Sequence, residues 1–403
     1  MNMRGIGQDL TMKKFLLFIL LVLILIGGWL YFVKGYMGVR KRHSVPAQLI
    51  YKAAIPGMEN IRIMIDPLKI KSSDLSKEIY KSGLSKATFH NPEINVLVVS
   101  GGGANGAYSA GMLCGWSDAG SRPEFDIVTG VSTGALISPA AFLGSDYDGI
   151  IKDIYTNISD ADIMKRDLLQ FIFEGRPSLM DTQPLRRVLK RTVTMDIMRA
   201  VARAHAEGRR LYIATTNLDA KRMVIWDMGA IASADTPEAL ELFRNVMLAS
   251  ASIPVAFPPV MLTVEAEGAL YNEMHVDGSV AIQMFGALLI VGYDEVKSKK
   301  TNVYAIRNGK LADVPTEVKF KMWDIAGASF ATLMTWQGYG DIYRFASLAK
   351  NKEISFYFAA IPYEFDDTHK GVFDLDYMRK LFYRGYKSAI SGAPWLEIAN
   401  LPE

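Results

Sequence analysis

The chain has 403 residues, half of them hydrophobic, and a formal net charge of +3. This composition is that of a globular protein with one large or two modest domains, and so small a charge gives no reason to expect a nucleic-acid partner. The single cysteine, Cys114, excludes an intramolecular disulfide. It falls in a predicted helix, where we expect a buried, unreactive thiol.

An apolar segment near the start of the chain predicts a membrane anchor. Residues 15–33 carry no charge, and nineteen helical residues span about 28 Å, close to the thickness of a bilayer core. Lys13 and Lys14 would also suit a cleaved signal peptide, but no small-residue cleavage motif follows. We therefore expect a tail over 1–14, a single-pass transmembrane helix over 15–33 and a membrane location. Positive charges on both sides leave the orientation open.

Residues 34–90 are predicted to be a juxtamembrane and N-terminal segment without recognisable chemistry. Basic residues between 34 and 42 could touch anionic head groups or form an ordinary flank of the anchor. Residues 54–62 predict a turn and a short strand that adds to the edge of the main sheet.

A strand, a glycine turn and a helix follow one another after residue 95. Residues 96–99 are a β-branched run typical of a buried strand, and residues 107–116 predict a helix. Between them stand Gly101, Gly102, Gly103 and Gly106. Such a turn directs several free N–H groups at one point, where the helix dipole also favours negative charge. We therefore expect an anion or oxyanion site here.

The same arrangement recurs one unit later, with a predicted strand over 125–129 and a predicted helix over 135–143. In the turn between them, Ser132 stands between Gly130 and Gly134 and matches the nucleophile elbow G-x-S-x-G. Glycines two residues on either side let backbone pass close to a serine held in a strained turn. Ser132 is therefore the candidate nucleophile.

Two other functions remain open from these residues. Gly101, Gly103 and Gly106 also satisfy the dinucleotide fingerprint G-x-G-x-x-G, with Asp126 near the position of the ribose-binding acid. That reading predicts a nucleotide-binding oxidoreductase, but Asp126 begins its strand instead of ending it, and Ser132 is left unexplained. The other alternative is a membrane-anchored, non-catalytic interaction protein.

The remaining elements alternate between helix and strand. We expect breaks in a helical region over 143–190, with a new helix beginning near Pro184. We predict helices over residues 195–207 and 237–251, a hairpin over residues 209–228 and a short strand over residues 273–277. Residues 301–307 are predicted to be the last core strand. A mainly helical region follows, with one strand-like run over 354–361 and a basic amphipathic helix over 372–387, which we expect to pack on the domain and not on a membrane.

The motifs, in this order, resemble those of the patatin-like phospholipases. The family's G-G-G-x-x-G, G-x-S-x-G and D-G-[GA] motifs correspond to residues 101–106, residues 130–134 and the run Asp277, Gly278 and Ser279, and residues 250–259 are similar to its proline block. The resemblance covers about residues 94–310. Asn105 stands where many members carry a basic residue, and Ser279 replaces a small one.

This resemblance implies both a fold and a function. The fold is a three-layer α/β/α domain over 91–311 with a mostly parallel sheet, followed by a mainly helical C-terminal extension over 312–403. The function is serine lipid acyl hydrolysis of the phospholipase A or lysophospholipase type on a lipid or phospholipid ester. The resemblance implies Ser132 and Asp277 as a catalytic dyad and Gly101, Gly102 and Gly103 as the oxyanion loop. It calls for no metal or cofactor, and the sequence makes no prediction of oligomeric state.

His275 leaves a triad as the alternative to this dyad. His275 and Asp277 are two residues apart and share one face of a predicted strand. A triad needs the histidine between serine and acid, which two strand neighbours do not easily achieve. We therefore expect Asp277 to be the base and His275 to be a packing or supporting residue.

Overall fold

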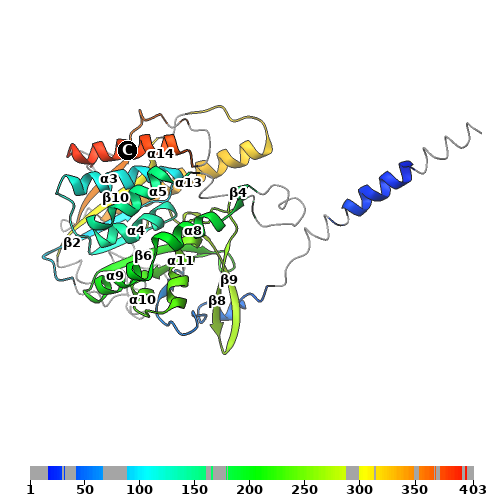
Figure 1. The fold of residues 1–403 in the computed structure, drawn as a ribbon, viewed down its shortest axis with the longest axis horizontal. Helices are drawn as coiled ribbons and strands as arrows, with labels where there is room; N and C mark the ends of the chain where they lie inside the picture. The colour runs from blue at the N-terminus through cyan, green and yellow to red at the C-terminus, as the bar shows by residue number, and fades with distance from the viewer. Residues whose placement is uncertain are drawn as a thin grey trace, which may run out of the picture.

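The computed structural model describes residues 17–29, 31, 42–66, 89–159, 165–166, 178, 180–286, 299–312, 315–348, 354–366, 368, 373–392 and 395–396. Within these residues a nine-stranded sheet forms the centre of the protein (Figure 1). Five neighbouring strands, in the order β6-β3-β2-β10-β11, run parallel, and the strands added beyond β6 are antiparallel. The predicted α/β class with a mostly parallel sheet is confirmed.

The strands are β1 (Arg62–Met64), β2 (Glu93–Val99), β3 (Ile127–Gly130), β4 (Lys165–Arg166), β5 (Met180–Asp181), β6 (Arg210–Asn217), β7 (Arg222–Asp227), β8 (Val260–Ala266), β9 (Ala269–Asp277), β10 (Lys300–Lys310) and β11 (Ile354–Ile361). The α-helices are α3 (Gly106–Asp118), α4 (Thr133–Leu143), α5 (Asp148–Asn157), α8 (Gln183–Thr192), α9 (Met195–Ala206), α10 (Met228–Ala232), α11 (Pro237–Ser250), α13 (Met322–Leu348) and α14 (Leu375–Ile390). Short 3₁₀ helices are η1 (Ala47–Leu49), η3 (Gly103–Asn105), η4 (Ser145–Tyr147) and η5 (Gly278–Val280).

The side chains of the central strands alternate between two buried cores, as the period of a strand requires. In β2, Leu97 and Val99 join the core beneath α3, α4, α11 and α14, whereas Val96 and Val98 join the core on the opposite face. Helix α13 covers part of that second face through Ile342 and Phe345. Because both faces are covered, residues 96–99 of β2 are apolar without interruption and fully buried.

The N-terminal apolar segment does not form the predicted anchor. The described helical run is 17–29, and among the described residues no helix is long and apolar enough to cross a membrane. The predicted tail over 1–14 lies outside the described residues, as does part of 15–33. The predictions of a single-pass helix, and of the membrane location inferred from it, are therefore wrong.

Beyond β10 the chain continues the main sheet. Residues 301–307 were predicted to be the last core strand, but β11 pairs in parallel with β10 and forms the edge of the sheet. The helix α14 buries its apolar face on α3, where the backbone of Phe382 lies against Gly111, so its expected packing on the domain is confirmed. The boundary at residue 311 stays a prediction, and elements on both of its sides share one sheet.

Candidate active site

Ser132 occupies the tight turn that joins β3 to α4. Its backbone has φ 54° and ψ −122°, a region that side chains other than glycine rarely adopt. The turn is held by the Ser132 N–H, which donates to Ser250 Oγ at 3.0 Å, and Ser250 Oγ in turn donates to the carbonyl of Ala214. A strained residue kept in place by its neighbours is typical of a functional position. The side chain is 4% exposed.

Gly134 shows why the elbow needs glycine in the first turn of α4. A Cβ at Gly134 would lie 2.3 Å from the carbonyl oxygen of Val99, so the helix could not begin so close to the end of β2. The elbow's other glycine, Gly130, and the motif residues Gly106 and Gly278 lie equally close to neighbouring atoms. All four motif positions predicted from the sequence therefore surround the turn at Ser132.

Asp277 ends β9 next to this turn. Its N–H donates to the carbonyl of Ser252 at 2.9 Å, and its carbonyl accepts the hydroxyl of Thr216 at 2.9 Å, so the backbone is held from two sides. Oδ1 accepts the N–H of Ser279 at 2.7 Å. Oδ2 is buried and has no hydrogen-bond partner among the described residues. Oδ1 is thus held by a hydrogen bond, whereas Oδ2 accepts no hydrogen bond from the described residues.

The electrostatics of Asp277 follow from its burial. Loss of solvent raises the pKa of Asp277 to about 6, while Ser132 and Ser279 act in the opposite direction by hydrogen bonding. The Ser132 hydroxyl is therefore a close neighbour of the carboxyl group, although no hydrogen bond of normal geometry joins the two side chains. A carboxylate with a pKa near 6 is a better base at neutral pH than an exposed aspartate.

The glycine loop between β2 and α3 faces the same point. Gly102 has φ 153° and Gly103 has φ 57°, so both use backbone angles that favour glycine. The Gly101 N–H donates to the carbonyl of Gln283 at 3.3 Å. Among the described residues, the N–H groups of Gly102 and Gly103 have no protein acceptor. A Cβ at Gly101 would lie 3.3 Å from Ser132 Cβ, which places the loop beside the elbow.

Asn308, near the end of β10, holds the glycine loop. Its N–H donates to Ser100 Oγ at 2.8 Å, and its Nδ2 donates to the carbonyl of Ser100 at 2.9 Å. Its Oδ1 accepts the N–H of Ser109 in α3. Sequence reasoning missed this residue because nothing near position 308 marks it. Only the parallel pairing of β10 with β2 brings it to the loop.

Two cavities meet at Ser132. One, with a volume of about 50 Å³, is lined almost wholly by apolar side chains of α4, α5, α8 and α11, such as Leu136, Ile154 and Leu189. The other, with a volume of about 310 Å³, is lined by Asp277 and the glycine loop, together with Arg307 and other polar side chains. Gly103, Ser132 and Ile253 belong to both. The serine therefore sits where an apolar channel joins a polar chamber.

The likeness to known proteins agrees with this geometry. Residues 97–289 match the family model for patatin-like phospholipases. The chain has a patatin-like phospholipase domain.

Two solved structures are similar to parts of the chain. The crystal structure of VipD from Legionella pneumophila matches with a TM-score of 0.35 and 14% identity, over 75% of this chain and 66% of VipD. Human GIVD cytosolic phospholipase A2 matches with a TM-score of 0.31 and 12% identity, over 68% of this chain and 51% of that protein. The chain thus covers about two thirds of the first and half of the second. No curated protein sequence matches it.

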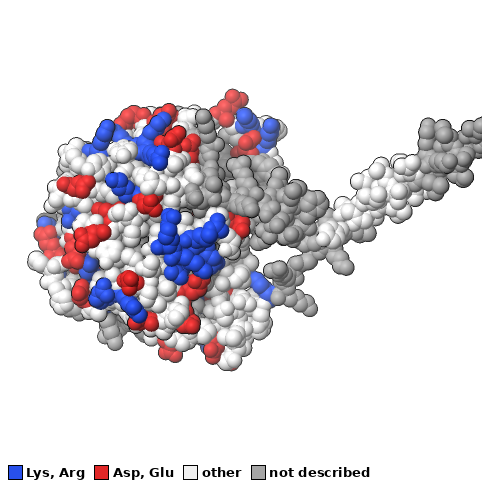
Figure 2. Space-filling model, viewed as in Figure 1, with Lys and Arg blue, Asp and Glu red and all other residues white. Residues whose placement is uncertain are grey.

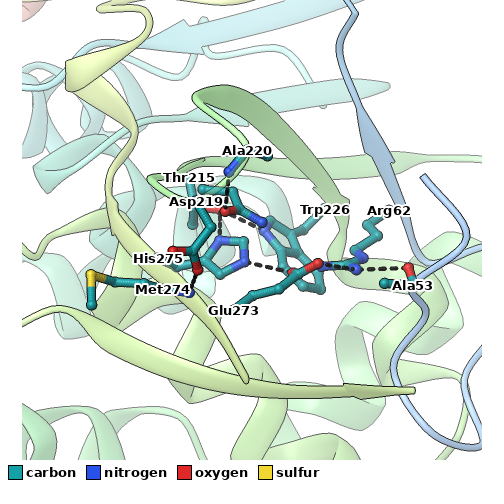
Figure 3. A network of polar contacts seen from close by, with 10 residues as sticks. Ala53, Arg62, Thr215, Asp219, Ala220, Trp226, Glu273, Met274 and His275 are labelled. Carbon is teal, nitrogen blue, oxygen red and sulfur yellow. Dashed lines mark hydrogen bonds and ion pairs between the residues drawn. The ribbon is translucent and has the colours of Figure 1, made fainter. Parts of the chain in front are cut away.

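His275 of the patatin-like domain is held away from the serine. Its Nδ1 is 2.9 Å from Thr215 Oγ1 and its Nε2 is 3.0 Å from Glu273 Oε2 (Figure 3). Arg62 pairs with the same glutamate, and Trp226 donates to the Thr215 hydroxyl at 2.8 Å. Burial lowers the pKa of His275. Both ring nitrogens are therefore occupied by a buried network that includes neither Ser132 nor Asp277.

Asp126 does not serve the glycine loop of the patatin-like domain. Its Oδ2 accepts the N–H of Asn95 at 2.8 Å and its Oδ1 accepts the side chain of Asn91 at 2.9 Å. These contacts lie at the amino ends of β2 and β3, whereas the glycine loop follows the carboxyl end of β2. Asp126 therefore ties strands together and cannot bind a ribose at the loop, which removes the main support for a dinucleotide site.

Replacing Gly102 tests the loop. A Cβ there would lie 2.3 Å from the carbonyl oxygen of Asn308, and backbone cannot yield as a flexible side chain would. We expect Gly102→Ala to displace the loop and to lower kcat by about 10²-fold, the usual loss of one oxyanion donor. Gly149→Ala in α5 is the matched control, because Gly149 lies outside the loop and a Cβ there meets nothing within 4 Å. A folded Gly102→Ala variant with the kcat of the wild type would contradict this role.

Proposed function

We propose that the chain is a serine lipid acyl hydrolase of the phospholipase A or lysophospholipase type that uses Ser132 and Asp277 as a dyad. The observation that carries the proposal is the position of Ser132. It lies in a strained elbow beside a buried carboxylate and an N–H-rich loop, at the junction of an apolar channel and a polar chamber. The match of residues 97–289 to the patatin-like phospholipases supports it.

In the acylation step, Ser132 Oγ attacks the carbonyl carbon of the ester, and its proton passes to Asp277 Oδ2. The free lone pairs of Oδ2 and the raised pKa of Asp277 both favour this transfer. The tetrahedral intermediate then expels the alcohol, which takes the proton from Asp277. The acyl group remains on Ser132 as an ester, with its chain in the apolar channel.

In the deacylation step, Asp277 takes a proton from water as the water oxygen attacks the acyl carbon. Collapse of the second intermediate breaks the bond to Ser132 Oγ, which receives the proton back from Asp277. The fatty acid leaves and the enzyme is restored. No metal or cofactor takes part in either step.

The oxyanion of both intermediates is assigned to the N–H groups of Gly102 and Gly103. They have no other acceptor in the described part of the chain, whereas the Gly101 N–H already donates to Gln283. The amino ends of α3 and α4 also meet here, since a Cβ at Gly106 would lie 2.1 Å from Thr133 Oγ1. Both helix dipoles favour negative charge at this point.

The polar chamber favours a phospholipid over a neutral lipid. Arg307 and Lys310 line it and are only 8% and 7% exposed. They supply positive charge to the chamber. Asn105, which also lines it, accepts the hydroxyl of Tyr377 at 2.6 Å. A phosphate diester is the anionic part of a phospholipid, and a buried cation binds it with little competition from water.

Removing one of these charges tests the choice of substrate. We expect Lys310→Met to lower kcat/KM for a short-chain phospholipid by about 10-fold or more, because a hydrogen bond to a charged group contributes roughly 1.5–3 kcal/mol. Hydrolysis of the matching diacylglycerol should change little. Lys300→Met is the control, since Lys300 lies at the other end of β10 and pairs with Glu93. Equal losses on both lipids would argue against head-group recognition.

The proposed function is tested by a fluorophosphonate probe and a phospholipid with different acyl chains at its two positions. An active serine hydrolase should take up the probe at Ser132, and mass spectrometry should detect one or both fatty acids. A chain that takes up no probe and releases no fatty acid would favour the alternative of a non-catalytic interaction protein. Tight binding of NADH would instead favour the oxidoreductase alternative.

A further inference from the structure

Helix α13 exposes an apolar surface that the catalytic steps do not use. From residue 325 to residue 340 it carries no charged side chain. Met322, Leu333 and Trp336 are each 69% exposed, and Phe320, just before the helix, is 98% exposed. A helix that is apolar on all sides is normally buried in protein or in lipid. This part of α13 is therefore an unusual surface for a protein that remains in water.

The two halves of α13 differ in their packing. In the second half, Ile342 and Phe345 are buried, and Asp341 accepts the N–H groups of Gln283 and Met284 at 2.9 and 3.0 Å. In the first half, residue 322 and residues 324–333 are exposed apart from Ala328, which is half-buried. The helix is thus fixed at one end and projects at the other, as the ribbon shows (Figure 1).

The projecting half borders the catalytic chamber. Phe330, Ala331, Met334 and Thr335 line the polar cavity that contains Ser132 and Asp277. Leu333 and Trp336 do not line it and are exposed. Residues 330–336 of α13 therefore line the substrate chamber on one side of the helix and expose apolar side chains on the other.

A basic surface lies beside the second cavity. In α8, Leu185, Val188 and Leu189 line the apolar channel, while Arg187 and Lys190 on the outer side are exposed. Figure 2 shows Lys and Arg side chains gathered over this helix. Lys319 and Lys321, which are also exposed, precede α13. The apolar channel is thus bordered by α8, which carries positive charge. The polar chamber is bordered by α13, which is preceded by two lysines.

We propose that the first half of α13, residues 322–336, inserts into the head-group region of a bilayer that contains anionic lipid. The apolar side chains enter the boundary with the acyl chains, and the cations of α8 face lipid phosphates, as in helices that lie on a membrane surface. This docking would bring the mouth of the chamber against the lipid. The choice of a bilayer as the occupant rests on the proposed lipid substrate.

The first test measures where Trp336 lies when vesicles are present. The full chain carrying Ser132→Ala is mixed with vesicles of phosphatidylcholine and about one quarter phosphatidylglycerol, with or without bromine on the acyl chains. We expect brominated lipid to quench part of the tryptophan fluorescence, and Trp336→Phe to reduce that part. Equal quenching with and without Trp336 would overturn the proposal, even if the chain binds vesicles through another segment.

The second test uses turnover. We expect Leu333→Gln combined with Trp336→Gln to lower hydrolysis of vesicle lipid by about tenfold or more, while hydrolysis of a soluble monomeric ester stays unchanged. The control combines Met261→Gln with Leu270→Gln, two exposed apolar residues of the β8–β9 hairpin. Arg187→Gln should weaken binding to anionic vesicles by about fivefold, the effect of one cation near such a surface.

Other occupants of the surface give different results. If a second copy of the chain covered it, the wild type would be a dimer in light scattering, and the Leu333→Gln, Trp336→Gln variant would be a monomer with unchanged vesicle hydrolysis. That result would overturn the proposal. A wild type that hydrolyses no ester would contradict the proposed function alone, because the quenching test uses the Ser132→Ala variant and needs no turnover.

Discussion

The Ser132→Ala variant is expected to lose ester hydrolysis by about 10³-fold or more while keeping its fold. The change removes the one oxygen that can form the acyl-enzyme, and loss of a nucleophile abolishes most of the catalysis of such a unit. Alanine can take the same backbone angles at similar cost, because both residues carry a Cβ at the strained φ of 54°. The measurement is fatty acid release at saturating substrate, together with fluorophosphonate uptake.

A control separates loss of chemistry from loss of structure. Ser109→Ala also removes a buried hydroxyl, which donates to the carbonyl of Gly106 at 3.1 Å, but it does not line either cavity. We expect this variant to keep the kcat of the wild type, and both variants to unfold at similar temperatures. Undiminished turnover by purified Ser132→Ala protein would end the proposal that Ser132 is the nucleophile.

Asp277→Asn is expected to be nearly as inactive as Ser132→Ala, whereas His275→Gln should keep most of the activity. An amide has the shape of the carboxyl group but almost no proton affinity, so it cannot act as the base. Glutamine at 275 can still face Thr215 and Glu273, the two partners of the imidazole. The measurement is kcat/KM for each variant. A folded His275→Gln variant as inactive as Ser132→Ala would replace the dyad by a triad.

The pH dependence gives a second view of the same base. Because burial raises the pKa of Asp277 to about 6, kcat/KM should rise with pH through about 6 as the carboxyl group loses its proton. The same limb should be present in His275→Gln, since in a dyad it belongs to the aspartate. A limb that disappears with His275 would identify the imidazole as the base.

The raised pKa also has a consequence for stability. The folded state binds a proton at Asp277 more tightly than the unfolded state does, so the ionised form costs stability above about pH 6. Asp277→Asn should therefore increase the free energy of unfolding by about 1–3 kcal/mol at neutral pH and change it little near pH 4. Urea unfolding at the two pH values measures this difference.

Local sequence patterns predicted much of the site. They did not identify residues that reach the site only through contacts between distant parts of the chain. The glycines around Ser132 are needed by the turn itself, so their spacing identifies the elbow without any other part of the chain. Asn308 has no such local requirement and acts on the loop only because β10 lies beside β2. The same limit explains why β11 was not expected at the edge of the sheet.

The apolar run over 15–33 illustrates a different limit. Its composition predicted a spanning helix, but composition does not determine how far a helix extends, and among the described residues no helix is long and apolar enough to cross a membrane. The sequence of α13 is also mostly apolar, and nothing in it distinguishes a buried helix from an exposed one. Because Asp341 and Phe345 pack against the domain, the second half of α13 is covered, whereas its first half is exposed.

By itself, the sequence determined the alternation of strands and helices, the α/β class and the positions of Ser132 and the motif glycines. These depend on periodicity and on backbone angles, which neighbouring residues set. Only the tertiary structure decided that Asp277 has a free oxygen beside Ser132, that His275 is occupied elsewhere, and that Arg307 and Lys310 enter the chamber. These depend on strand pairing between distant residues and on burial, which no local pattern records.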